Sequence, residues 1–320
     1  MNVTFPEKKL VSVIITTHNR APKFVIRALN SVFNQTYKKL QIIVVDDSTP
    51  DYPLRSEVEF ALRQFMVNNA KDIMGIMYIK HTTNQGACAA RNIGLIHAKG
   101  YYVAFLDDDD EWFPEKIEEQ LTGFTDNHIA FVYCGCVVIN EMRSTKYLYS
   151  TIYKKGNIFY SLLDRNYIGG TSNPLIKKVC IEKIGGFDIN MRSAQDYDLW
   201  LQLTLHYPVN YIKKPLLNYY EHCGERISTD IDGKIAGAER INMKYNQYVV
   251  KNNRTWSMRQ RALIPLYLKK GWKKKAYKLW FSCVQKDPLC FLQNGKQLLL
   301  IIFGYDSLLY QAYSKIQRLA

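Results

Sequence analysis

The stretch Tyr101-Tyr-Val-Ala-Phe-Leu-Asp-Asp-Asp-Asp110 places four consecutive carboxylates directly after an apolar run that has the composition of a buried strand. Four carboxylates this close repel one another strongly where water is scarce, so we expect a cation among them. A hard divalent ion is the first candidate, because such ions prefer oxygen ligands and often link a protein carboxylate to substrate phosphates. The alternative is a solvated acidic turn that caps the next helix, because Asp is favoured at helix N-termini.

From residue 10 onward, apolar runs rich in β-branched residues alternate with amphipathic segments, which predicts a mostly parallel sheet covered by helices. The expected strands are residues 10–16, 40–45, 75–80, 101–106, 130–139 and 175–176, and the expected helices are residues 22–34, 57–68, 87–98, 114–124 and 196–207. Ligands of such sheets bind beyond the carboxyl ends of the strands. Three polar segments fall at those ends, namely residues 16–19, 46–48 and 107–110. Their coincidence favours a binding site over a solvated turn.

Composition narrows the class of protein. The chain of 320 residues has a formal net charge of +14, from 43 Lys and Arg against 29 Asp and Glu. Such an excess indicates a polyanionic partner: nucleic acid, an anionic membrane surface or phosphorylated ligands. The seven cysteines are odd in number and have no C-x-x-C spacing, which argues against a disulfide scaffold or a structural zinc site. We expect a protein of the reducing cytosol, soluble or peripheral, because residues 1–10 lack the layout of a secretory signal.

The last third of the chain differs in character. From about residue 235 the apolar periodicity is helical and Lys and Arg are frequent, so we predict one domain over residues 1–230 and a helical extension over 231–320. Within the extension, Lys269-Lys-Gly-Trp-Lys-Lys-Lys275 and the aromatic residues after it suit an anionic membrane surface. The alternative is a solvated helix face over a small core.

Six segments, in family order over roughly the first two thirds of the chain, resemble the family 2 inverting glycosyltransferases. The segments are Val11-Ser-Val-Ile-Ile-Thr-Thr-His-Asn-Arg20, Ile43-Val-Val-Asp-Asp-Ser48, Asn84-Gln-Gly-Ala-Cys-Ala-Ala-Arg-Asn-Ile-Gly94, Tyr102-Val-Ala-Phe-Leu-Asp-Asp-Asp-Asp-Glu-Trp112, Gly185-Gly-Phe-Asp188 and Gln195-Asp-Tyr-Asp-Leu-Trp200. A lone DxD would be weak, and the joint order makes the resemblance specific. It implies the GT-A fold, which is α/β with a mostly parallel central sheet. It also implies transfer of a sugar from a nucleotide-diphosphate sugar to a glycan or lipid-linked acceptor in cell-surface polysaccharide synthesis.

The resemblance also divides the acidic run. It assigns Asp107 and Asp109 to a Mn²⁺ or Mg²⁺ ion, with Asp109 at the position that the family most often uses for direct ligation. The ion would neutralise the charge that builds on the leaving pyrophosphate. Asp108 and Asp110 are expected to support the site or cap the next helix, and Asp108 is counted among the residues that bind the nucleotide sugar.

For the nucleotide, the resemblance implies that Asp47 or Asp46 accepts a hydrogen bond from the imide N–H of uracil, which points to a UDP-sugar. Thr16 and His18 would line the same base, although the family usually has Tyr or Phe at the position of His18. Arg91 lies early in a helix whose N-terminus favours anions, and it would contact the nucleotide or its phosphates. The alternative for this arginine is a simple ion pair with a nearby carboxylate.

Inversion requires a base on the face of the sugar opposite the leaving group. Asp196 matches the aspartate of the family's Glu-Asp pair, but here Gln195 precedes it; Asp198 is the competing candidate. Farther along, His222 is expected as a further metal ligand and Arg226 as a pyrophosphate contact in a polar loop. The alternative for this pair is a surface loop without such a role.

Trp112 and Trp200 are candidates for stacking on a sugar, although buried packing positions are more usual for this residue type. Two other classes of protein fit parts of this pattern. A sugar-nucleotide pyrophosphorylase would need a glycine-rich phosphate loop after the first strand, and residues 16–20 contain no glycine. A polyanion-binding protein without enzymatic activity would explain the charge of +14 but not the acidic strand ends, so no nucleic-acid partner is expected. The enzyme is expected in the cytoplasm, with peripheral contact to the inner face of the cytoplasmic membrane.

Overall fold

The computed structural model describes residues 9–69, 75–149, 152–221, 230–289 and 291–303. The chain forms two compact units. The first, here called the sheet unit, comprises Met1–Ile158, Tyr167–Ile189 and Asp196–Gly224. The second, the helical unit, comprises Phe159–Asn166, Asn190–Gln195 and Glu225–Ala320. Within the described residues no helix is both long and apolar enough to cross a membrane.

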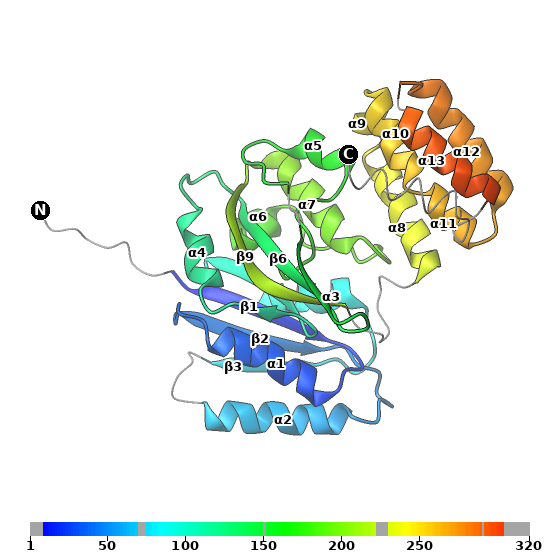
Figure 1. Cartoon of the computed structure of the whole chain (residues 1–320). Coiled ribbons are helices and arrows are strands. Elements are labelled where there is room, and N and C mark those ends of the chain that lie inside the picture. The colour runs from blue at the N-terminus through cyan, green and yellow to red at the C-terminus, as the bar shows by residue number, and fades with distance from the viewer. Residues whose placement is uncertain (1–8, 70–74, 150–151, 222–229, 290, 304–320) are drawn as a thin grey trace, which may run out of the picture. The chain divides into compact units, whose positions relative to one another are not determined.

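The sheet unit is built on one mixed sheet (Figure 1). Its strands are β1 (Val11–Thr17), β2 (Leu40–Asp46), β3 (Ile76–Lys80), β4 (Tyr102–Asp107), β5 (Glu111–Trp112), β6 (Phe131–Asn140), β7 (Thr145–Tyr149), β8 (Leu175–Lys177) and β9 (Asn210–Glu221). The order is β3-β2-β1-β4-β8-β6-β9-β5, and β7 pairs with β6. The first four strands are mutually parallel, whereas β8 runs antiparallel between β4 and β6. The predicted α/β class with a central sheet and flanking helices is confirmed.

The helices of the sheet unit are α1 (Pro22–Phe33), α2 (Arg55–Asn68), α3 (Ala87–His97), α4 (Lys116–Thr122), α6 (Lys178–Lys183) and α7 (Gln195–His206). They cover both faces of the sheet. In β1, Val11 and Val13 are fully buried in a cluster with Leu29 of α1. Ile14 points to the other face, since successive side chains of a strand alternate. There α3 comes so close that a Cβ on Gly94 would lie 2.4 Å from Ile14 Cγ2.

The helical unit contains α5 (Phe159–Asp164), α8 (Ile231–Lys244), α9 (Asn246–Val249), α10 (Asn253–Arg261), α11 (Ile264–Lys269), α12 (Lys273–Lys286) and α13 (Phe291–Phe303). Its core consists of Ile235, Leu263, Ile264, Tyr267 and Ala276. Residues 159–166 belong to this unit although they precede the boundary at residue 231 expected from sequence. They are held there by long-range contacts, such as the 2.8 Å hydrogen bond that Thr255 Oγ1 donates to Asp164.

Candidate active site

The carboxyl ends of β1, β2 and β4 lie side by side at one edge of the sheet. In the parallel register, Thr17 is opposite Asp46 and Thr16 is opposite Asp107. The three polar segments that follow these strands, residues 16–19, 46–48 and 107–110, are therefore neighbours. This edge is where open α/β sheets bind their ligands.

Asp46, at the end of β2, is fully buried. Its carboxylate accepts hydrogen bonds from the Ser48 N–H (2.8 Å), the Tyr78 hydroxyl (2.7 Å) and Arg55 Nε (3.1 Å). Burial acts to raise the pKa of Asp46, but these hydrogen bonds outweigh it and leave the pKa below its ordinary value. Asp46 is thus an ionised anchor inside the protein, and it can reach a ligand only if this network opens.

Replacing Arg55 with Met is expected to lower the free energy of unfolding by about 3 kcal/mol, because Asp46 would stay buried without its cation. Urea unfolding measures this loss. The matched control is Arg63→Met in the same helix. The Arg63 side chain is 68% exposed in its pair with Glu59, so its removal should change stability by about 0.5 kcal/mol at most. Equal losses in the two variants would contradict the anchoring role of Asp46.

Asp47 ties the end of β2 to the loop before α3. Its carboxylate accepts the N–H groups of Gln85 (2.7 Å) and Gly86 (2.8 Å) and contacts His81 Nδ1 at 2.8 Å. Gly86 has a φ of 88°, a left-handed conformation that favours glycine and directs its N–H toward the carboxylate. Asp47 is 3% exposed, so it lies at the floor of the site.

His18 follows β1 and is exposed. Its Nδ1 donates to the carbonyl oxygen of Asp47 at 2.8 Å, which fixes the ring over the end of β2. Thr16, near the end of β1 itself, is partly exposed. The structure thus brings together Thr16, His18 and Asp47, as the sequence predicts.

Asp107 is the carboxylate of the acidic run that is most open to solvent, with 31% of its side chain exposed. Arg91 of α3 reaches it through a 2.8 Å ion pair, and the Thr171 hydroxyl lies 3.0 Å and 2.9 Å from its two oxygens. Arg91 itself is 7% exposed, and its guanidinium lies 5.4 Å from the Phe187 ring. The ion pair with a nearby carboxylate, one of the two predictions for Arg91, is present. It also places a positive charge at the strand ends, as the predicted contact to phosphates requires.

Asp108 and Asp109 share a second cation. Arg20 donates from Nε to Asp108 (3.0 Å), and its terminal nitrogen lies 3.4 Å from Asp109. Asp108 also accepts the Thr17 hydroxyl at 2.6 Å. Burial raises the pKa of Asp108 to about 6 against the opposing effect of Arg20, and repulsion from Asp109 adds to the rise. The backbone of Asp109 is held as well, because its carbonyl oxygen accepts from Arg27 at 2.6 Å.

Asp110 is the most buried carboxylate of the acidic run. It is 2% exposed and accepts the Ser172 hydroxyl at 2.6 Å, while the Tyr220 N–H lies 3.4 Å away. Burial, followed by repulsion from Asp109 and Asp107, raises the pKa of Asp110 well above its ordinary value. The repulsion expected from the sequence is therefore present, and Arg20 and Arg91 are the cations that oppose it.

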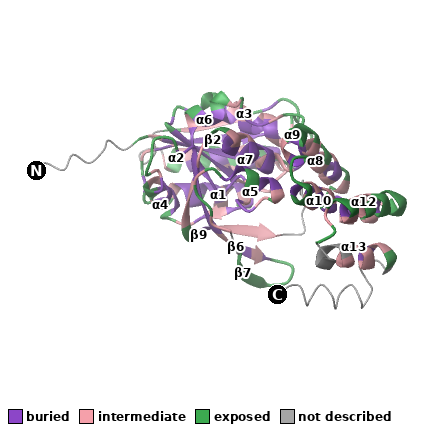
Figure 2. Cartoon of the chain, turned by 90° about the horizontal axis from the view of Figure 1, so that it is seen from above, coloured by how far each residue is buried: buried purple, intermediate pink, exposed green. Residues whose placement is uncertain are grey.

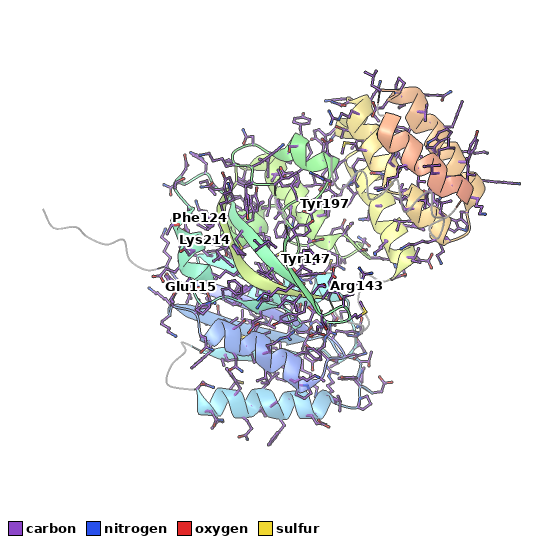
Figure 3. All side chains as sticks on the ribbon, in the orientation of Figure 1. Glu115, Phe124, Arg143, Tyr147, Tyr197 and Lys214 are labelled. Carbon is purple, nitrogen blue, oxygen red and sulfur yellow. The ribbon has the colours of Figure 1, made fainter. Side chains whose placement is uncertain are left out.

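Asp196 lies in the first turn of α7, just before the buried Tyr197, which Figure 3 labels. Burial raises the pKa of Asp196 to about 6; the Arg91 charge lowers it and the Asp107 charge raises it. Asp196 therefore belongs to the same electrostatic group as the acidic run. Asp198, the competing candidate, is 1% exposed and accepts a hydrogen bond from Gln202 of its own helix at 2.8 Å.

The acidic run fits a hard divalent ion only in part. No three His, Cys, Asp or Glu side chains of the described residues are arranged to hold a metal. Asp107 and Asp109 provide carboxylate oxygens, which are the ligands that Mg²⁺ and Mn²⁺ prefer. Magnesium is commonly bound through one or two carboxylates, with substrate phosphates and water completing its shell. The residues present therefore fit an ion that arrives with a diphosphate rather than a resident metal cage.

Several residues at this site were not singled out from the sequence. Thr171 and Ser172, in the segment between α5 and β8, hold Asp107 and Asp110, and Arg20 holds Asp108. The run of small and polar residues at 169–174 is visible in the sequence. The sequence does not show that it contacts the acidic run, which lies 62 to 64 residues away.

The two tryptophans predicted as sugar-stacking candidates lie in the core. Trp112 and Trp200 are buried, and their indole N–H groups donate to the carbonyl oxygens of Ser172 and Gly169. They are packing residues rather than sugar-stacking surfaces. His222 and Arg226 lie outside the described residues, so their predicted roles stay predictions.

Known proteins are similar to this chain in sequence. One relative is an uncharacterized glycosyltransferase of Haemophilus influenzae, 32% identical over 197 residues; the match covers 61% of this chain and 62% of the relative's length. Another is the putative colanic acid biosynthesis glycosyl transferase WcaA of Escherichia coli, 28% identical over 276 residues, which cover 80% of this chain and 92% of WcaA.

Two solved structures have the same fold. S. aureus TarS 1–349 in complex with UDP-GlcNAc has a TM-score of 0.62 at 17% identity, covering 97% of this chain and 92% of the other. The mannosyltransferase PcManGT from Pyrobaculum calidifontis, in complex with GDP-Man and Mn²⁺, has a TM-score of 0.57 at 19% identity, covering 98% and 85%. The model of "Glycosyl transferase family 2" matches residues 12–184, more than half of the chain. The chain therefore belongs to glycosyl transferase family 2.

Proposed function

We propose that this protein is an inverting glycosyltransferase that moves a sugar from a nucleotide-diphosphate sugar, a UDP-sugar, to a glycan or lipid-linked saccharide. The observation that carries the proposal is the Asp107–Arg91 ion pair at the carboxyl ends of the strands, whose two charges both act on the pKa of Asp196. It combines a site for a diphosphate with a separate carboxylate of raised pKa. Family membership and the WcaA relative support a role in polysaccharide synthesis.

On the donor side, Asp107 and Asp109 would hold Mn²⁺ or Mg²⁺. Such an ion, when bound, supplies positive charge that stabilises the leaving diphosphate. Arg91 adds a second positive charge beside Asp107, in a buried and therefore fixed position. Because this charge is oriented before the reaction, no reorganisation is needed as the leaving group becomes more negative. The neighbouring PcManGT structure contains Mn²⁺ and a nucleotide sugar, which supports this arrangement.

Asp47, Thr16 and His18 would bind the nucleobase. An ionised carboxylate has about four acceptor positions. Gln85, Gly86 and His81 occupy three of those of Asp47, and the remaining one is available to an imide N–H. Asp46 is an anchor and not a contact to the base. Asp108 accepts a hydrogen bond from Arg20 and would act on the nucleotide only indirectly, by positioning this arginine.

Asp196 would act as the base. It accepts the proton of the acceptor hydroxyl as that oxygen attacks the anomeric carbon, and the bond from this carbon to the diphosphate oxygen breaks with its electron pair on the diphosphate. A pKa of about 6 suits this task, because the group is ionised at neutral pH yet more basic than an ordinary carboxylate. The buried, hydrogen-bonded Asp198 is less suited to it.

The transfer rate is expected to fall about tenfold per pH unit below pH 6, because Asp196 must be deprotonated to accept a proton and its pKa is raised to about 6. Above pH 7 this dependence should be absent. The measurement is kcat/KM against pH, with circular dichroism at each pH to show that the protein stays folded. A rate that stays constant down to pH 4.5 would contradict a base with this pKa.

The donor can be identified with a panel of nucleotide sugars that includes UDP-GlcNAc and GDP-Man. We expect one UDP-sugar to raise the thermal unfolding temperature in the presence of Mn²⁺ and to be slowly hydrolysed to UDP. Asp47→Ala should lose the stabilisation. A control, Arg63→Met on the exposed face of α2, should retain it. Stabilisation by a GDP-sugar alone would overturn the UDP assignment, and no response to any donor would overturn the function.

We further propose that the enzyme works at the inner face of an anionic membrane. The net charge of +14 and the lysine-rich helical unit support this location, because a lipid-linked acceptor is presented there.

A further inference from the structure

Helix α12 has an inner and an outer face that differ in chemistry. Ala276 and Cys283 are fully buried on the inner face, where α12 packs against α10, α11 and α13. The outer face exposes Lys274, Tyr277 and Lys278, with Phe281 one turn farther along. Figure 2 shows much of α12 in the colour of exposed residues. The spacing of three and four residues places these four side chains on a single helical stripe.

The lysines of this stripe, and the exposed Lys273 beside it, are not neutralised. Among the described residues, no carboxylate lies within ion-pair distance of Lys273, Lys274 or Lys278, and α12 itself contains no acidic residue. Elsewhere in the same unit lysines are paired, as Lys275 is with Glu239 (3.1 Å) and Lys270 with Asp232 (2.5 Å). The outer face of α12 therefore has a positive charge that the unit does not use internally.

The aromatic residues of this face leave much of their surface in solvent instead of packing it inside the helical unit. Tyr277 is 50% and Phe281 49% exposed, and Trp272, which precedes the helix, is 43% exposed. Lysines beside amphipathic rings on a helix surface match an interfacial helix, in which rings enter the headgroup region and ammonium groups contact anionic lipids. A single-stranded nucleic acid would also attract the lysines, and its bases could stack on the rings, so competition by an oligonucleotide is one outcome of the test below.

We propose that the outer face of α12, formed by Lys273, Lys274, Tyr277, Lys278 and Phe281, docks on the headgroup region of an anionic bilayer. The purpose of this contact rests on the proposed function, since it would hold the enzyme where lipid-linked acceptors are. The docking itself requires only the lysines and the rings.

The test is co-sedimentation of the full chain with phosphatidylcholine vesicles, with and without phosphatidylglycerol. The protein should bind only the anionic vesicles, and high salt should weaken the binding because the lysine contribution is screened. Replacing Lys273, Lys274 and Lys278 with Glu should reduce binding about tenfold or more. In the matched control, Lys99, Lys183 and Lys213 of the sheet unit, all exposed, are replaced with Glu, which gives the same change in net charge. The control should bind nearly as the parent does.

A second variant, Tyr277→Ser with Phe281→Ser, separates the apolar contribution. It should lose the binding that remains at high salt, because the rings and not the charges supply it. All of these positions are exposed, so unfolding temperatures should match that of the parent chain.

Three outcomes would overturn the docking: no binding to anionic vesicles at low salt, equal loss in the control variant, or displacement from vesicles by a short oligonucleotide that binds more tightly. Donor hydrolysis, measured on the same variants, should be unchanged. If no donor is turned over but the vesicle pattern holds, the proposed function fails and the docking stands. If donors are turned over and vesicles are not bound, the docking fails and the proposed function stands.

Discussion

Replacing Asp196 with Asn should lower the rate of sugar transfer by about 10²–10⁴-fold, the usual contribution of a general base. Asn has nearly the same shape but cannot accept the proton of the acceptor hydroxyl. UDP affinity should stay within about twofold, because the donor is proposed to bind at Asp47, Asp107 and Arg91. Transfer assays with saturating donor, together with calorimetric titration of UDP, measure the two quantities separately.

The same substitution should make the protein more stable at neutral pH. Burial raises the pKa of Asp196 from 3.8 to about 6, so folding favours the neutral form of this group. Stability from this group is full below pH 3.8 and is lost as the pH rises through about 6, where the buried carboxylate becomes ionised. Asn lacks this charge, and the gain at pH 7 is at most about 3 kcal/mol. Urea unfolding at pH 5 and pH 7 should show a larger gain at the higher pH.

Asp198→Asn is the matched control, two residues away in the same helix. Its carboxylate accepts from Gln202 and is buried, so we expect a change in stability while most of the turnover remains. If Asp196→Asn retains the parent turnover, the base has been assigned to the wrong residue. If Asp198→Asn alone abolishes transfer, Asp198 is the base.

Asp109→Ala should abolish the effect of Mn²⁺ on nucleotide binding and lower transfer by about 10²-fold or more, since the ion would lose a ligand next to the leaving diphosphate. The measurement is calorimetric titration of UDP with Mn²⁺ and, separately, with a chelator. With the chelator, the variant and the parent should bind UDP alike. Unchanged Mn²⁺ dependence in the variant would remove Asp109 from the metal site.

Asp110→Asn provides the control within the acidic run. Burial and repulsion from Asp109 and Asp107 raise the pKa of Asp110 well above its ordinary value, so the folded protein already favours its neutral form. An amide of the same size in the same place should leave Mn²⁺-dependent binding intact. A loss as large as that of Asp109→Ala would show that the acidic run acts as a unit.

The sequence by itself determined those strands and helices that the composition and periodicity of their own residues predict. The runs that became β1, β2 and β4 are short, apolar and bounded by polar residues, so their composition alone predicts a buried strand. Because parallel strands end at one edge, the meeting of residues 16–19, 46–48 and 107–110 also followed from the order of elements. This prediction needs only the alternation of strand and helix.

The tertiary structure alone decided how each polar group at the strand ends is held in the fold. Asp46 and Asp47 are adjacent in sequence, yet one is locked by Arg55 and the other closes the loop before α3. No local pattern distinguishes these roles, because Arg55 lies 9 residues from Asp46 and Gly86 lies 39 residues from Asp47. β9 was missed for a related reason, since Lys213, Lys214 and Pro215 interrupt its apolar pattern and pairing with β6 stabilises it instead. Composition and periodicity report on neighbours in the chain, whereas charges and hydrogen bonds act between neighbours in space, which only folding defines.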